Sequence, residues 1–126
     1  MTFKGINKVY FLGIGGIGMS ALARWFRHEG YPVAGYDKTS SPLTQELERE
    51  GILIGFEDSA SSVPLEFTTN PDEVLVVWTP AIPKESVLLN FFQAHYNLKK
   101  RSEVLGMITK DFYSIAVAGT HGKTST

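Results

Sequence analysis

The sequence contains no cysteine. This absence excludes a disulfide-stabilised scaffold and a zinc site built from thiolates, and it is typical of proteins in a reducing compartment. There is no run of about 18 apolar residues, so we expect no membrane-spanning helix. The 12 basic and 13 acidic side chains nearly cancel, to a net charge of −1, which provides no strong positive field for nucleic acid. The N-terminus has a short apolar run without a cleavage site, and we do not interpret it as a signal peptide.

What remains is a chain of 126 residues, 43% hydrophobic and 20% charged, the length and composition of about one globular domain. Short apolar runs alternate with helix-length amphipathic stretches, which is the pattern of βαβ units in a parallel sheet. We therefore predict an α/β fold, a Rossmann-like parallel sheet flanked by helices, over residues 1–112. Residues 113–126 are expected to be the first strand and phosphate loop of a second, truncated domain. The strands are predicted at residues 8–12, 32–36, 52–54, 73–78, 98–100 and 113–118.

Apolar spacing and capping residues predict the helices. The residues from Met19 to Phe26 place apolar side chains at helical spacing after a glycine cluster. Ser41 and Pro42 have the types preferred at the N-cap and first turn of a second helix, which we expect to end at Gly51. Residues 56–72 are irregular. A third helix is predicted over residues 85–95, and a fourth is predicted to run to about residue 110 with Ser102 as its N-cap. The predicted apolar side of the third helix consists of Val87, Leu88, Phe91 and Phe92.

Glycine is the one residue type in excess: the chain has 12, and four of them lie between Gly13 and Gly18. They form the pattern Gly-Ile-Gly-Gly-Ile-Gly between a predicted strand and a predicted helix. Gly13 allows a sharp turn, Gly15 and Gly16 allow backbone amides to approach an anion, and Gly18 allows close packing of helix and strand. The free N–H groups and the helix dipole favour a diphosphate there. Asp37, at the end of the next strand, suits the hydroxyls of a ribose.

A second phosphate loop, Gly119-Thr120-His121-Gly122-Lys123-Thr124, follows the apolar run at residues 113–118. Lys123 is expected to reach β- and γ-phosphate oxygens, and Thr124 to hold Mg²⁺. The strict P-loop pattern has glycine at position 117, where this chain has Val117. The first loop alone does not distinguish NAD from a nucleotide sugar, because both carry a pyrophosphate. The second loop argues against a dehydrogenase, which has no use for a γ-phosphate clamp.

Five segments together resemble the Mur ligases of bacterial cell-wall synthesis, and the resemblance runs the length of the chain. They are GIGGIGMSALA at 13–23, YDKTSSPLTQEL at 36–47, VVWTPAIP at 76–83, KRSEVLG at 100–106 and AGTHGKTST at 118–126. The first loop is most similar to that of the alanine-adding members of the family, and the murein peptide ligases come second. The departures from the family pattern, at residues 78–80 and at Ser125, are mild.

The resemblance implies a substrate and a reaction. Such ligases have an N-terminal domain for the UDP-sugar, a central ATPase domain, and a C-terminal domain that helps to bind the amino acid. The lactyl carboxylate of UDP-N-acetylmuramate attacks the γ-phosphate of ATP, and the amine of L-alanine then displaces phosphate from the acyl phosphate. The implied cofactors are ATP and Mg²⁺, and the implied small-molecule partners are UDP-N-acetylmuramate, ATP and L-alanine. We expect this step of peptidoglycan biosynthesis to be cytoplasmic, without nucleic acid, membrane or obligate protein partner, and the 126-residue piece alone to be inactive.

The resemblance also implies site residues by position. The UDP-sugar is assigned to Gly13, Gly15, Gly16, Ile17, Gly18, Met19, Asp37, Thr39, Thr79, Pro80, Ala81, Ile82, Arg101, Ser102 and Glu103. ATP is assigned to Gly119, Thr120, His121, Gly122, Lys123, Thr124 and Ser125, with Lys123 as the catalytic residue and Thr124 as the metal ligand.

Other interpretations of the same residues stay open. Without the resemblance, the chain could be an NAD-binding Rossmann regulatory module or a domain that docks a partner. Asp37 could be a solvated acid, and Arg101 a surface cation in a basic run. We assign no metal or general-base role to His28 or His95, which lie late in predicted helices.

Overall fold

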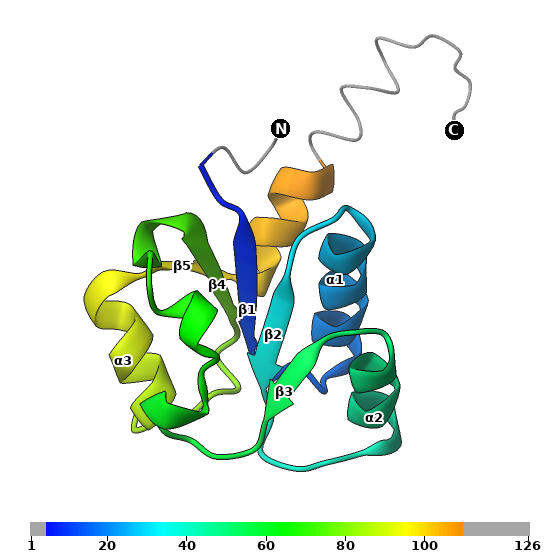
Figure 1. Cartoon of the computed structure of the whole chain (residues 1–126), viewed down its shortest axis with the longest axis horizontal. Helices are drawn as coiled ribbons and strands as arrows, with labels where there is room; N and C mark the ends of the chain where they lie inside the picture. Colours follow the sequence, from blue (N-terminus) through cyan, green and yellow to red (C-terminus); the bar gives the residue numbers. More distant parts are fainter. Residues whose placement is uncertain (1–4, 110–126) are drawn as a thin grey trace, which may run out of the picture.

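The computed structural model describes residues 5–109, which form a five-stranded parallel sheet in the order β3-β2-β1-β4-β5 (Figure 1). The predicted α/β class is therefore confirmed. Residues 101–109 form a further helix. The predicted strand at 113–118 and the second phosphate loop lie outside the described residues. The elements are β1 (Lys8–Leu12), α1 (Ile17–His28), β2 (Val33–Tyr36), α2 (Pro42–Arg49), β3 (Leu53–Gly55), β4 (Val74–Trp78), α3 (Val87–His95) and β5 (Asn97–Lys100).

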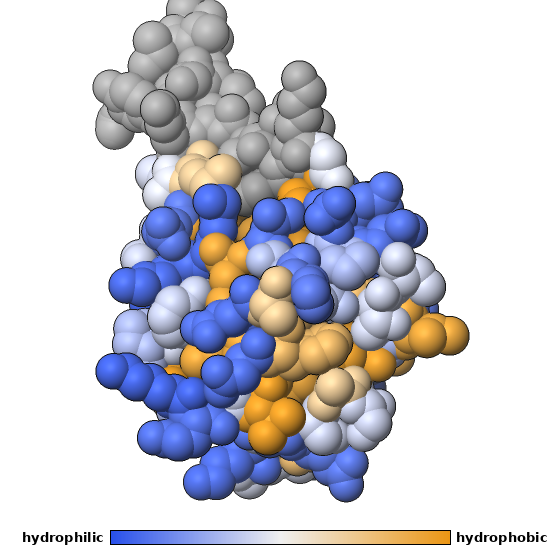
Figure 2. Space-filling view, turned by 90° about the vertical axis from the view of Figure 1, so that its left-hand side faces the viewer, coloured by the Kyte–Doolittle hydropathy of each residue, from blue (hydrophilic) through white to orange (hydrophobic). Residues whose placement is uncertain are grey.

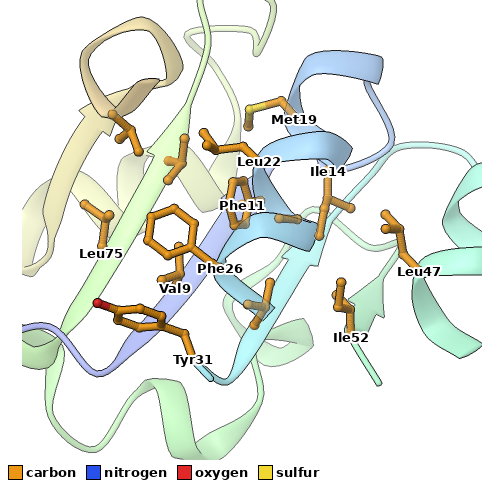
Figure 3. Close-up of a cluster of buried hydrophobic side chains, with 14 of the residues drawn as sticks. Val9, Phe11, Ile14, Met19, Leu22, Phe26, Tyr31, Leu47, Ile52 and Leu75 are labelled. Carbon is orange, nitrogen blue, oxygen red and sulfur yellow. The ribbon is translucent and has the colours of Figure 1, made fainter. Parts of the chain in front are cut away.

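Strand β1 is the centre of the molecule, and its residues from Val9 to Leu12 are completely buried. Successive side chains of a strand point to opposite faces of the sheet, so β1 supplies two cores. Val9 and Phe11 belong to the cluster covered by α1, α2 and the helix of residues 101–109 (Figures 1 and 3). Tyr10 and Leu12 belong to the cluster covered by α3. Burial on both faces explains why β1 and β4 are apolar almost throughout.

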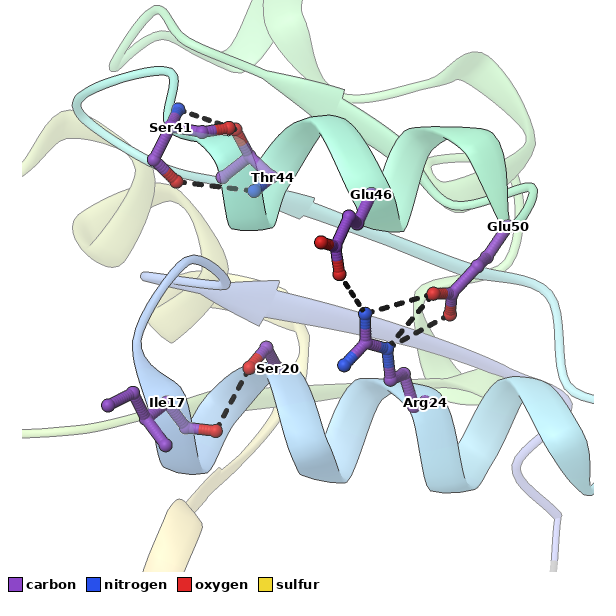
Figure 4. A network of polar contacts seen from close by, with 7 residues as sticks. All are labelled: Ile17, Ser20, Arg24, Ser41, Thr44, Glu46 and Glu50. Carbon is purple, nitrogen blue, oxygen red and sulfur yellow. Dashed lines mark hydrogen bonds and ion pairs between the residues drawn. The ribbon is translucent and has the colours of Figure 1, made fainter.

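The two ends of α2 show how local sequence sets an element boundary. Ser41 is the N-cap and Pro42 lies in the first turn, as the sequence predicts, and Ser41 also forms a reciprocal capping box with Thr44 (Figure 4). At the other end Gly51 has a φ of +96°, and the N–H of Ile52 donates to Leu47 O at 3.1 Å. This is a Schellman motif. The N–H of Ile52 is used in this motif and does not pair with a neighbouring strand, so β3 begins at Leu53 and not at residue 52 as predicted.

Helix α3 corrects the predicted apolar side. The helix begins at Val87, with Ser86 as its N-cap. Leu88, Leu89 and Phe92 are buried against the sheet, whereas the side chain of Val87 is 53% exposed. The prediction that Val87 lies on the buried side was wrong, because Leu88 and Leu89 of the same turn enter the core and Val87 stays exposed. Phe91 is partly buried and packs against the cluster.

The irregular segment before β4 is held to α3 by Asp58. This segment contains three short 3₁₀ turns, at Ala60–Ser62, Leu65–Phe67 and Pro71–Glu73. Asp58 Oδ1 accepts from the Ser86 hydroxyl and the Leu88 N–H, each at 2.9 Å, and Oδ2 accepts from the Val87 N–H at 3.1 Å. The carboxylate therefore satisfies the N–H groups at the start of α3.

The last described helix begins two residues earlier than predicted, and Ser102 is not its N-cap. Residues 101–109 are helical, and the backbone N–H of Lys100 donates to Glu103 Oε1 at 2.8 Å. A glutamate three residues after the N-cap that accepts the N-cap N–H is half of a capping box. Lys100 is therefore the N-cap, and Ser102 is exposed in the first turn. Strand β5 thus leads directly into the helix.

Two surface features complete the described fold. Arg24 of α1 pairs with Glu46 and Glu50 of α2 at 3.0 and 2.9 Å (Figure 4). All three side chains are substantially exposed, so these ion pairs contribute little stability. The face that carries α3 has hydrophobic residues in its middle, surrounded by hydrophilic ones (Figure 2). Within residues 5–109, no helix has the length and apolarity needed to cross a membrane.

Candidate functional site

The carboxyl ends of the strands meet at one edge of the sheet because all strand pairs are parallel. After β1 the chain adds β2 and β3 on one side of it, and then crosses to the other side to add β4 and β5. The order of the strands therefore reverses at β1. In open α/β sheets this switch point, outside the carboxyl ends, is where ligands bind. The glycine loop follows β1, Asp37 follows β2, the segment 79–82 follows β4, and Arg101 follows β5. Every described segment to which the sequence assigned the UDP-sugar therefore lies at this edge.

The glycine loop turns from β1 into α1 and leaves the start of the helix open. Gly13 has a φ of +88°, as its predicted role in a sharp turn requires. Gly16 is the N-cap of α1 and provides no side chain to cap it, and the first turn contains no acidic residue. Among residues 5–109, the N–H groups of Ile17, Gly18 and Met19 have no hydrogen-bond acceptor. These amides, at the positive end of the helix dipole, form a site suited to an anion.

The other helices of the described chain start differently. The first turn of α2 is capped by Ser41 and Thr44, and that of α3 by Ser86 and Asp58. Glu103 accepts the N–H of the residue that precedes the helix 101–109. Unlike α2 and α3, α1 therefore has no side chain that caps its first turn, and its open start coincides with the glycine-rich loop at the switch point.

Asp37 is bound to the glycine loop itself, which the sequence did not predict. Its Oδ2 accepts from the Gly15 N–H at 2.7 Å, and its Oδ1 accepts from the Thr39 N–H at 3.1 Å. Each carboxylate oxygen can accept more than one hydrogen bond, so Asp37 keeps acceptor capacity for a ligand. The Gly15 amide, which we expected to face an anion, already faces this carboxylate. The remaining amides for a diphosphate are those from Ile17 onward.

Close contacts join the segments of the site through three glycines. A Cβ on Gly13 would lie 3.5 Å from the Ile82 side chain, one on Gly15 would lie 2.6 Å from Asp37 Oδ2, and one on Gly18 would lie 2.9 Å from Arg101 Nη1. Gly15 and Gly18 therefore allow the segments after β2 and β5 to approach the loop after β1, whereas the distance at Gly13 is an ordinary van der Waals contact. In particular, the guanidinium of Arg101 lies against the first turn of α1. Its predicted assignment to the UDP-sugar is compatible with this geometry.

The other predicted residues divide into two groups. Thr79, Pro80 and Ala81 form a turn in which the Ala81 N–H donates to Thr79 Oγ1 at 3.3 Å and the Ile82 N–H donates to Thr79 O at 3.1 Å. Thr39 is exposed beside Asp37. In contrast, the Met19 side chain is 4% exposed and belongs to the core, so only its backbone faces the edge. Glu103 is engaged in capping, and Ser102 is exposed.

Electrostatics and shape distinguish the two sides of the loop. Near β2, burial raises the pKa of Tyr36, as do the charges of Asp58 and Asp37, so its phenol stays neutral at neutral pH. Between α1 and the helix of residues 101–109 lies a cavity of about 300 Å³ that begins at Gly18 and Arg101. Its remaining lining is apolar: Ala21, Leu22, Trp25, Leu105 and Ile108.

Some predicted residues lie outside the described part of the chain: Gly119, Thr120, His121, Gly122, Lys123, Thr124 and Ser125. Within residues 5–109, no group of three or more His, Asp or Glu side chains is placed to hold a metal ion.

Comparison with known protein families matches residues 8–113 to the family described as "Mur ligase family, catalytic domain". The chain belongs to the Mur ligase family. The family predicted from the five sequence segments is thus confirmed. A curated relative, the UDP-N-acetylmuramate–L-alanine ligase of Cytophaga hutchinsonii, is 56% identical over 127 aligned positions. The alignment covers 100% of this chain and 27% of that Mur ligase, so the chain spans about a quarter of the length of this relative.

Solved structures of Mur ligases share the fold. The UDP-N-acetylmuramate-alanine ligase of Thermotoga maritima has a TM-score of 0.65 and 28% identity, and covers 82% of this chain and 23% of its own. A UDP-N-acetylmuramate:L-alanyl-gamma-D-glutamyl-meso-diaminopimelate ligase from Neisseria meningitides has a TM-score of 0.63 and 19% identity. The match covers 76% of this chain and 29% of that ligase. The second likeness concerns the fold alone.

Proposed function

We propose that residues 1–112 are the UDP-sugar-binding domain of a Mur ligase that joins L-alanine to UDP-N-acetylmuramate in the cytoplasm. The open start of α1 carries this proposal. It offers the N–H groups of Ile17, Gly18 and Met19, beside the guanidinium of Arg101, at the switch point of the sheet. A diphosphate satisfies both the amides and the cation.

The ligand has a direction across the edge of the sheet. The uridine lies toward β2, where Asp37 and Thr39 follow the strand. The diphosphate lies on the glycine loop, from Gly13 to Met19. The sugar lies toward β4 and β5, beside the turn at residues 79–82 and the start of the helix at residues 101–103. In this arrangement Met19 contributes its backbone, and Glu103 acts through the helix start that it caps.

The chemistry of the proposed ligase begins with a carboxylate that is a poor acylating agent. Its oxygen attacks the γ-phosphorus of ATP, ADP leaves, and the acyl phosphate then has a good leaving group. The amine of L-alanine attacks the acyl carbon and expels phosphate. Residues 113–126 supply the ATP loop in this proposal, with Lys123 stabilising charge on the transferred phosphoryl group and Thr124 holding Mg²⁺. Ligation requires the parts of the longer relatives that this chain does not span, so the chain alone binds substrate without turning it over.

The alanine-adding reaction is favoured over the alternatives by the relatives. Curated proteins from several genera, 45–56% identical to this chain, carry the name UDP-N-acetylmuramate–L-alanine ligase. The ligase from Neisseria meningitides, whose name specifies a peptide, is only 19% identical to this chain, and that similarity concerns the fold alone. The NAD-binding alternative rests on the glycine loop alone.

A thermal-shift experiment on the 126-residue chain tests the proposal. UDP-N-acetylmuramate at about 100 times its dissociation constant raises the free energy of unfolding by about 2.7 kcal/mol. We expect the melting temperature to rise by roughly 5–10 °C, and NAD at the same concentration to have little effect. The variant Lys123→Ala keeps the same shift, because the UDP-sugar and ATP loops are separate. A shift with NAD alone contradicts the proposal, and loss of the shift in Lys123→Ala contradicts the division at residue 112.

A further inference from the structure

The cavity of about 300 Å³ between α1 and the helix of residues 101–109 has an interior that the proposed function does not use. Its lining includes Leu22 and Ile108, which are buried in the core, and Ala21 and Leu105, which are exposed. The cavity therefore extends from the core to the surface. Its volume lies at the lower end of the range of ligand pockets, so it suits a small molecule.

Trp25 lines this cavity and is held in place by the core. Its ring makes an edge-to-face contact with the ring of Phe26, with the centroids 5.0 Å apart and an interplanar angle of 88°. Phe26 is completely buried, and Trp25 is partly buried against the same cluster. A side chain fixed in this way loses little conformational freedom when a ligand packs against it. Trp25 thus provides a preformed apolar wall.

Arg101 supplies the one charge among the described residues that line the cavity. Its guanidinium lies against Gly18, where an added Cβ would be 2.9 Å from Nη1 and 3.2 Å from Cζ. The ion pairs among residues 5–109 join Arg24 to Glu46 and Glu50, and Arg101 takes part in neither. An apolar interior with one cation at its end complements an apolar molecule that carries one negative charge.

The lining favours a carboxylate over a phosphate as this negative group. A guanidinium binds a carboxylate through two parallel hydrogen bonds, which engage both oxygens without a second cation. A phosphate monoester carries more charge and more acceptor oxygens. Apart from Arg101, the described lining contains no cation and no polar side chain that could bind them.

We propose that this cavity binds a small apolar monocarboxylate, whose carboxylate pairs with Arg101 and whose apolar body lies between Trp25 and Leu105. Such a ligand engages the guanidinium that the proposed function assigns to the diphosphate, and it places a second anion beside that group. Its binding therefore opposes the binding of UDP-N-acetylmuramate, a consequence that rests on the proposed function. The cavity is thus an inhibitory site beside the substrate site.

Titration of the ¹⁵N-labelled chain with hydrocinnamate, and with the neutral hydrocinnamyl alcohol, tests the site by NMR. We expect hydrocinnamate to cause saturable shifts of the Trp25 indole N–H and of the Leu105 and Ile108 amides. The alcohol should bind about tenfold more weakly, because it lacks the charge-assisted contact. Arg101→Met removes this preference for the carboxylate, and Arg101→Lys keeps part of it. The chain has two tryptophans, so Trp78→Phe identifies the Trp25 signal.

A variant that fills the cavity separates it from the substrate site. Ala21→Leu should abolish the shifts caused by hydrocinnamate and leave the affinity for UDP-N-acetylmuramate unchanged. Ala94→Leu, the same replacement at an exposed position of α3, is the matched control and should bind both ligands normally. In isothermal titration, saturating hydrocinnamate should weaken UDP-N-acetylmuramate binding by about tenfold in the unsubstituted chain, and not in Ala21→Leu.

The contrary outcomes are distinct. Absence of saturable shifts at the cavity, or the same shifts in Ala21→Leu, overturns the site. Equal binding of hydrocinnamate and its alcohol overturns the pairing with Arg101. Unchanged UDP-N-acetylmuramate affinity at saturating hydrocinnamate overturns the inhibition. If hydrocinnamate binds at the cavity but the chain alone fails to bind UDP-N-acetylmuramate, the proposed function is contradicted and the carboxylate site is supported.

Discussion

Gly15 and Asp37 show how a single contact shapes the site. The Asp37 carboxylate accepts the Gly15 N–H at 2.7 Å and thereby ties the end of β2 to the loop after β1. A Cβ on Gly15 would lie 2.6 Å from Asp37 Oδ2 and 3.1 Å from Thr44 Cγ2. Thr44 is completely buried and forms part of the capping box of α2. Glycine is required here because the neighbouring groups have little room to move.

Gly15→Ala is therefore expected to displace Asp37 and strain the contact with Thr44. We expect a loss of about 1–3 kcal/mol of stability, seen as a melting temperature lower by roughly 3–10 °C, together with weaker binding of UDP-N-acetylmuramate. The control is Gly16→Ala, because a Cβ on Gly16 meets its nearest atom, Gly13 O, at 3.6 Å. If both variants melt at the temperature of the unsubstituted chain, the proposed crowding at Gly15 is wrong.

At the scale of elements, the sequence predicts what depends on neighbouring residues. The start of α2 was predictable because Ser41 and Pro42 have the types preferred at the N-cap and in the first turn, and the strands were predictable from their apolar runs. The start of β3 was misplaced by one residue and that of the last helix by two, because capping bonds at Ile52 and Lys100 decide them. The apolar side of α3 was misjudged at Val87 because the spacing of apolar residues does not show that Leu89, and not Val87, packs against the sheet.

Contacts between distant residues were not predictable from the sequence. The bonds from Asp58 to the start of α3 cross 28 to 30 residues, and Asp37 meets Gly15 across 22. Arg101 was predicted at the correct edge of the sheet, because it follows β5, but its contact with Gly18 depends on the packing of two helices. The sequence thus predicted which segments meet at the carboxyl edge, and the fold determines which of their groups remain open.

The cap provided by Asp58 makes a prediction at this scale. Asp58→Ala removes the acceptor for Ser86, Val87 and Leu88 and detaches the irregular segment from α3. We expect the free energy of unfolding to fall by about 1–3 kcal/mol, and the amides of Val87 and Leu88 to exchange faster than those at the start of α2. Glu57→Ala, at an exposed neighbouring position, is the control and should leave both properties unchanged. Equal exchange rates in the two variants would show that the cap contributes nothing.

At the scale of the whole molecule, the parallel sheet places the segments that follow β1, β2, β4 and β5 at one edge. Helices cover both faces, so the edge is where backbone amides and charged side chains stay open to a ligand (Figure 1). The chain spans about a quarter of the length of the curated Mur ligase from Cytophaga hutchinsonii, and this quarter corresponds to the five-stranded sheet with its helices. This is the basis for assigning one substrate, and not the whole reaction, to these residues.

The most direct test of the account is a titration of the ¹⁵N-labelled chain with UDP-N-acetylmuramate, followed by amide chemical shifts in NMR spectra. The account predicts the largest shifts at the open amides of Ile17, Gly18 and Met19, with smaller ones at Asp37 and Arg101. Amides at the amino edge of the sheet, such as that of Asn7, should not respond. Saturable shifts at the amino edge, with Ile17 to Met19 unchanged, would contradict the central claim that α1 receives the diphosphate.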